Sequence, residues 1–71
     1  MRIKDVIQYL NDEIQQNKKY QKNIAEDMKH DELNYAYYRG EMLQCENVIQ
    51  RNYYLIHLLE SCLEYQEAAA K

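Results

Sequence analysis

The chain has 71 residues, a net charge of −3, two cysteines, one glycine and no proline. A chain of this length buries only about 60% of its unfolded surface, so we expect a single domain over residues 1–71 that gains stability by association. Two cysteines are too few for a disulfide scaffold. The opening residues lack the apolar region of a signal peptide, and no apolar run approaches the roughly 20 residues of a membrane span. We therefore expect a cytoplasmic protein without a membrane partner.

The charges are distributed unevenly along the chain. Residues 1–30 carry six Lys or Arg against five Asp or Glu, whereas residues 31–71 carry three against seven. Because an acidic second half repels phosphate groups, nucleic acid is an unlikely partner.

The first half shows the four-three spacing of an amphipathic helix, which we place at about residues 2–29. A seam of core-facing positions runs along it, and its middle is polar. The seam consists of Ile3, Ile7, Leu10, Ile14, Asn17, Gln21, Ile24 and Met28.

A turn is expected at Lys29-His30-Asp31, where Asp31 is able to cap the next helix and Glu32 lies in its first turn. The second helix is expected at about residues 32–67. Its seam consists of Tyr35, Tyr38, Met42, Cys45, Ile49, Asn52, Ile56, Leu59 and Leu63.

Two helices with a short connection favour an antiparallel hairpin. The predicted fold class is therefore all-α, a two-helix antiparallel hairpin that we expect to dimerise into a four-helix bundle. Pairing places Ile14 beside Val48 and Ile49, and Leu10 beside Arg51 and Asn52.

Gly40 lies inside the second helix, where glycine costs about 1 kcal/mol relative to alanine. Close packing of Tyr20 or Gln21 against its bare backbone is the expected compensation, and a kink or a partner contact is the alternative. The closing residues 67–71 resemble an engineered helical linker, so residues 68–71 are interpreted as a tail without a function.

In residues 48–63, apolar side chains cover more of the helix circumference than a single neighbouring helix can bury. We expect a second copy of the chain to cover part of this surface, and another protein to cover the rest. The predicted protein-binding or oligomer interface comprises Tyr37, Ile49, Asn52, Tyr53, Tyr54, Leu55, Ile56, Leu58, Leu59, Cys62 and Leu63.

Asn17 and Asn52 occupy seam positions where apolar residues contribute more stability. Buried asparagines at such positions fix register and oligomeric state, so both are candidate specificity residues. The alternative is that both rotate to the margin of the bundle and contact water.

Catalytic chemistry has weak support in this sequence. His57, Glu60 and Glu64 have a spacing that could supply metal ligands, but no second Glu-x-x-His element accompanies them. We expect no enzyme activity, no metal and no cofactor.

The main functional hypothesis is a small protein-binding adaptor or inhibitor that acts as a homo-oligomer. The abundance of Lys, Asn, Ile and Tyr is typical of AT-rich genomes and suggests a phage or mobile-element protein. The alternative is a nucleic-acid or nucleotide binder that uses Lys18, Lys22 and Lys29 of the first helix with stacked tyrosine rings.

Overall fold

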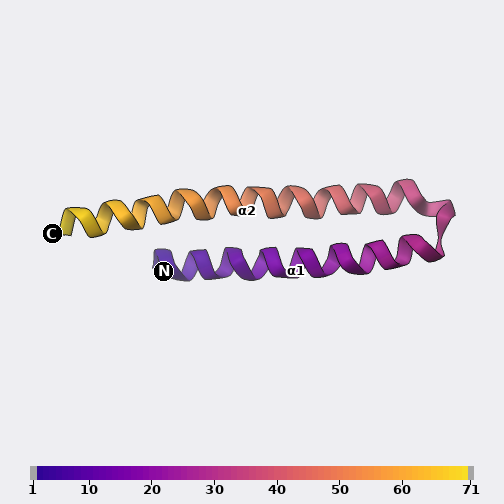
Figure 1. Ribbon diagram of the computed structural model, residues 1–71, viewed down its shortest axis with the longest axis horizontal. Helices are drawn as coiled ribbons and strands as arrows, with labels where there is room; N and C mark the ends of the chain where they lie inside the picture. The colour runs from indigo at the N-terminus through magenta and orange to yellow at the C-terminus, as the bar shows by residue number, and fades with distance from the viewer. Residues whose placement is uncertain (1, 71) are drawn as a thin grey trace.

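The structure, a computed structural model, describes residues 2–70 and is a helical hairpin. Helix α1 spans Ile3–His30, a short 3-10 turn η1 spans Glu32–Asn34, and helix α2 spans Tyr35–Ala70. The two helices lie side by side and antiparallel, and α2 extends past the start of α1 (Figure 1). The prediction of an all-α hairpin is confirmed. Helix α2 begins three residues later than expected and ends at Ala70 instead of about residue 67, because its Ala-rich end consists of strong helix formers.

Charged side chains at both ends of α1 complement its helix dipole. At the start, the Asp5 carboxylate accepts a hydrogen bond from the backbone N–H of Arg2 at 3.3 Å. At the end, Lys29 and His30 each lie 3.5 Å from the Glu26 carboxylate. A negative charge near a helix N-terminus and positive charges near its C-terminus complement the helix dipole.

The turn contains Asp31, but this residue does not cap α2 as expected. Its carboxylate accepts hydrogen bonds from the Asn34 side chain at 2.8 Å and from the Tyr38 hydroxyl at 3.2 Å. The Asn34 backbone N–H donates to the Asp31 carbonyl at 3.4 Å, so residues Glu32–Asn34 form a 3-10 turn and α2 starts only at Tyr35.

The core follows the predicted seam. Leu10 and Ile14 of α1 are buried against Ile49 and Ile56 of α2, and Ile14 is fully inaccessible. Val6, Ile7 and Leu59 pack around this cluster, while Ile24 is buried nearer the turn. The expected pairing of Ile14 with Ile49, and of Leu10 with Asn52, is confirmed by this cluster and by a hydrogen bond described below.

We predict that Ile49→Asp unfolds the chain, whereas Lys22→Asp leaves it folded. Ile49 is only 3% exposed, so an aspartate there places an unpaired charge in the core of a protein with little stability to spare. Lys22 is exposed. Circular dichroism melting curves compare the two variants with the parent. Equal helical content and melting temperature in both would contradict the seam assignment.

Gly40 is not a close-packing site. A Cβ atom built on its backbone meets nothing within 4 Å, and its backbone does not adopt a positive φ. The expected contact with Gln21 is absent because the Gln21 amide reaches the Met42 carbonyl, at 3.3 Å, and the Glu46 carboxylate, at 3.1 Å. Helix α2 therefore carries the entropic cost of a glycine without any packing that requires one.

Gly40→Ala is accordingly expected to raise the free energy of unfolding by about 0.5–1 kcal/mol, because alanine restricts the unfolded chain and finds open space in the fold. Ala36→Gly, at another exposed position of α2, is the matched control and should lower stability by a similar amount. Urea denaturation at a fixed protein concentration measures both changes. A destabilising Gly40→Ala would mean that another molecule approaches the bare backbone.

Within residues 2–70, neither α1 nor α2 contains a stretch with the length and apolarity that crossing a bilayer requires.

Candidate protein-binding surface

Asn52 is the buried polar residue around which the two helices meet. Its side-chain amide donates to the Leu10 carbonyl at 3.2 Å and to the Glu13 carboxylate at 2.8 Å. Its side-chain oxygen accepts from the Arg51 guanidinium at 3.4 Å, and Arg51 also binds Glu13 at 3.3 Å. Asn52 is fully inaccessible. The alternative that it contacts water at the margin is wrong, and its amide fixes the register of the hairpin within one chain.

Asn17, the second candidate specificity residue, is half-buried. Its amide donates to the Glu13 backbone carbonyl, one turn earlier in the same helix, at 2.9 Å. This local bond contributes nothing to the pairing of α1 with α2.

Asn52→Asp is expected to lower the free energy of unfolding by several kcal/mol, because it replaces both donor hydrogens by a buried charge beside the Glu13 carboxylate. Adding Glu13→Gln should recover part of the loss, since a glutamine amide can donate to the new carboxylate. Asn47→Asp, at an exposed position, is the control and should change stability by less than about 0.5 kcal/mol. Urea denaturation that finds Asn52→Asp no worse than this control would show that the hydrogen bonds do not stabilise the fold.

The residues predicted to form an interface divide into two groups. Ile49, Asn52 and Ile56 lie inside the hairpin, where they contact α1, and Leu59 and Leu63 are half-buried beside them. Ile49, Asn52 and Ile56 are therefore not part of an exposed surface. The exposed members are Tyr37, Tyr53, Tyr54, Leu55, Leu58 and Cys62.

The side chains next to the seam give the hairpin two different flanks. In an antiparallel pair, positions just before Ile14 and Ile49 in each heptad lie on one side, and positions just after Asn17 and Asn52 lie on the other. Contacts support this division. Tyr20 and Glu41, both of the first kind, line one shallow pocket, whereas Lys18 and Tyr53, both of the second kind, touch each other.

One flank is polar and is called the charged flank here. It brings lysines of α1 beside glutamates of α2. The Lys18 ammonium donates to the Tyr53 hydroxyl at 2.8 Å and lies 5.5 Å from the centre of its ring. Hydrogen bonds from Gln50 and Gln21, and then the charge of Lys18, hold the pKa of Glu46 below its usual range. The charged flank comprises Lys4, Lys18, Lys22, Lys29, Glu46, Tyr53, Glu60 and Glu64.

The opposite flank is mainly apolar and is called the apolar flank. Its exposed rings belong to Tyr9, at 63% exposure, and Tyr20, at 48%, and Leu55 is 37% exposed. The ion pair between Glu13 and Arg51 lies on this side, and Glu41 is a further carboxylate nearer the turn. The apolar flank comprises Val6, Tyr9, Tyr20, Val48, Leu55, Leu59 and Cys62.

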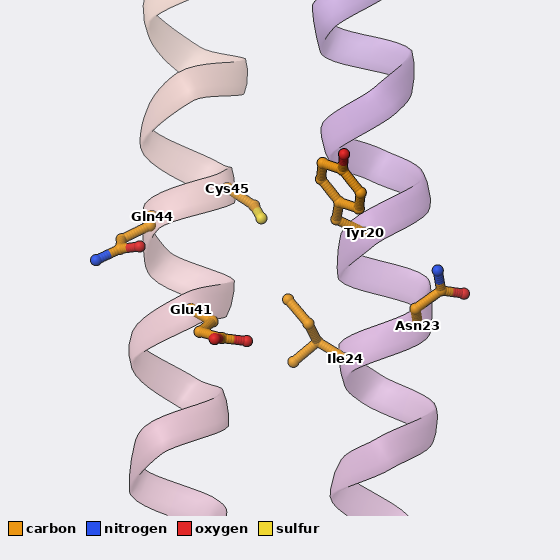
Figure 2. A pocket seen from close by; sticks show the side chains of 6 residues that line it. All are labelled: Tyr20, Asn23, Ile24, Glu41, Gln44 and Cys45. Carbon is orange, nitrogen blue, oxygen red and sulfur yellow. The ribbon is translucent and has the colours of Figure 1, made fainter.

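Near the turn, the apolar flank opens into a shallow pocket between the helices. Figure 2 shows Tyr20 and Ile24 of α1 and Cys45 of α2 turned toward this space, with Gln44 and Asn23 pointing away from it. Glu41 also lines the pocket. The pocket combines one carboxylate with mainly apolar side chains. This lining is typical of a surface that packs against another protein and lacks an acid-base pair for catalysis.

A second apolar surface runs along the outside of α2 and is called the outer stripe. It consists of Tyr54, Leu58, Ser61, Cys62 and Tyr65, at spacings of three and four residues. All but Tyr54 line a shallow, mainly apolar depression together with Gln66. Tyr65 is 77% exposed. No side chain of α1 covers this stripe, because α1 packs on the Ile49–Ile56 side of α2.

Tyr37 lies apart from these surfaces, near the start of α2. Its ring packs edge-to-face on Tyr38, with centres 5.8 Å apart. A hydrogen bond to Glu41 and the charge of that carboxylate raise the pKa of the Tyr37 phenol.

The candidates for chemistry, His57, Glu60 and Glu64, are all exposed on α2. Among residues 2–70, no group of three His, Cys, Asp or Glu side chains has the geometry to hold a metal ion. Cys45 is half-buried and Cys62 is exposed, and both are free thiols.

Comparison of the chain with protein-family models, curated proteins and solved structures finds no match.

Sequence reasoning missed Tyr9, Tyr20 and Val6 of the apolar flank, because it sought exposed apolar residues only in the second half. Assigning heptad positions to the first helix could have found them, since Val6 and Tyr20 immediately precede the seam residues Ile7 and Gln21. Glu13 was missed as the partner of Asn52. The sequence places Glu13 about one helical turn after Leu10, the residue expected opposite Asn52, and this position could have identified it.

Proposed function

We propose that the chain is a small, non-enzymatic protein-interaction module that acts as a homo-oligomer and serves as an adaptor or inhibitor of another protein, of the phage or mobile-element type. The observation that carries this proposal is the outer stripe, where Leu58 and Tyr65 are exposed at spacings that suit one face of a partner helix.

The composition of the outer stripe supports a protein target. Tyrosine and leucine side chains supply apolar area, and the tyrosine hydroxyls and Ser61 supply hydrogen bonds at the rim, which is the usual make-up of a protein interface. Such a surface discriminates by shape and apolar contact, since its five residues include no Asp, Glu, Lys or Arg.

Affinity capture from an extract of the native host tests the proposal. The parent chain and His57→Glu, a change at the preceding position and about 100° around α2 from Leu58, should retain the same target, whereas Leu58→Glu should lose it because a charge then enters the apolar contact. Mass spectrometry identifies what is retained. If no protein retained by the parent and by His57→Glu is lost with Leu58→Glu, the proposal fails.

A second candidate, nucleic-acid binding, is favoured by one contact only, the Lys18 ammonium beside the Tyr53 ring. The same flank carries Glu46, Glu60 and Glu64, which oppose a phosphate backbone. Salt separates the candidates. Retention of nucleic acid that falls steeply between about 50 and 200 mM salt, and that disappears in Lys18→Glu, would support this candidate over the first.

A further inference from the structure

The apolar flank and the outer stripe adjoin along α2, where Cys62 belongs to both, but they differ in shape. The outer stripe is one helix wide and belongs to α2 alone. The apolar flank is built by both helices, with Val6, Tyr9 and Tyr20 from α1 and Val48 and Leu55 from α2. It therefore spans the full width of a hairpin whose cross-section is 15 × 15 Å. A surface built by two helices is best covered by another pair of helices, as in a four-helix bundle.

The charges on the apolar flank suit a second copy of the same chain. Two copies each carry a net charge of −3, so they repel wherever their acidic residues meet. On the apolar flank, Glu13 is paired with Arg51 at 3.3 Å, and the side chains around this pair are uncharged. Face-to-face packing around this pair brings no unpaired like charges together, and the Glu41 carboxylate of the same flank lies nearer the turn. The charged flank differs, because its exposed lysines and glutamates lose hydration when covered, and such pairs return little energy.

The exposed apolar area is sufficient for a dimer. With roughly 200 Å² for a tyrosine side chain, the exposed parts of Tyr9 and Tyr20 come to on the order of 200 Å² per chain. The partly exposed aliphatic side chains and Cys62 add about as much again. Two chains then contribute on the order of 800 Å² of apolar area. Since about 60% of an interface is apolar, the total is roughly 1,300 Å², within the range of stable complexes.

We propose that a second copy of the chain packs face-to-face on the apolar flank, completing a four-helix bundle, and that the outer stripe stays uncovered for the target protein. The inference rests on the proposed function, since it assigns self-association to the flank built by both helices and target binding to the outer stripe of α2. Tyr9 and Leu55 lie in the contact between copies, Leu58 lies in the contact with the target, and Tyr53 on the charged flank faces solvent.

Sedimentation equilibrium of the purified full chain at micromolar concentration tests the assignment. The parent should have the mass of two chains. Leu55→Glu should have the mass of one chain, with a dimer dissociation constant raised by at least about 100-fold, because two carboxylates enter the apolar contact. Tyr53→Glu, two residues away on the charged flank, should remain a dimer. Circular dichroism confirms that each variant is helical.

Tyr9→Glu provides a second test on α1, where the ring is well exposed and the change leaves the hairpin core intact. It should also dissociate the dimer, whereas the neighbouring Gln8→Glu should not. A parent with the mass of one chain, or of more than two, overturns the inference. So does dissociation by Tyr53→Glu, or a dimer that persists in both Leu55→Glu and Tyr9→Glu.

The outcomes for self-association and for target binding are independent. Leu58→Glu should keep the mass of two chains while losing the target, because it changes the outer stripe alone. A monomeric parent that still captures the target overturns the inference and leaves the proposed function standing. A dimeric parent that retains no target lost with Leu58→Glu overturns the proposed function and leaves the dimer standing.

Discussion

The hydrogen bonds of one buried amide fix how this hairpin is aligned. Asn52 reaches across to the Leu10 carbonyl and the Glu13 carboxylate, and Arg51 completes the group. A seam of leucine and isoleucine can slide by a heptad and still bury apolar area, but an amide that loses its partners in the core costs free energy in every shifted register. The alignment of all other residues across the hairpin follows from this contact.

Register in turn decides which side chains share a flank. With Asn52 level with Leu10, Lys18 comes to lie beside Tyr53, and Gln21 reaches Glu46. Lysines of α1 and glutamates of α2 therefore partly neutralise each other on one side. Tyr9 and Tyr20 remain on the other side and Tyr54 and Tyr65 on the outside of α2, whereas Tyr53 lies on the charged flank. The molecule therefore has one well-hydrated flank and two apolar surfaces.

The unpartnered surfaces also explain how so small a chain can be useful. A two-helix hairpin has one seam, and α1 covers only one side of α2, so the remaining apolar area is available for binding. Gly40 contributes neither to the seam nor to these binding surfaces. It has open space around it and no strained backbone, and the packing of this chain offers no reason for a glycine there.

Apolar spacing in the sequence was enough to predict two helices, their antiparallel pairing and the core from Leu10 to Ile56, because helical periodicity is a local property that survives without tertiary information. The exposure of Leu55 and Leu58 followed from crowding on one helix. Tertiary structure decided the rest. Asp31 binds side chains instead of capping α2, Gly40 meets no neighbour, and Asn52 turns inward to Glu13. Each of these outcomes depends on distances between residues remote in sequence, or on competition between hydrogen-bond partners, which spacing alone does not contain.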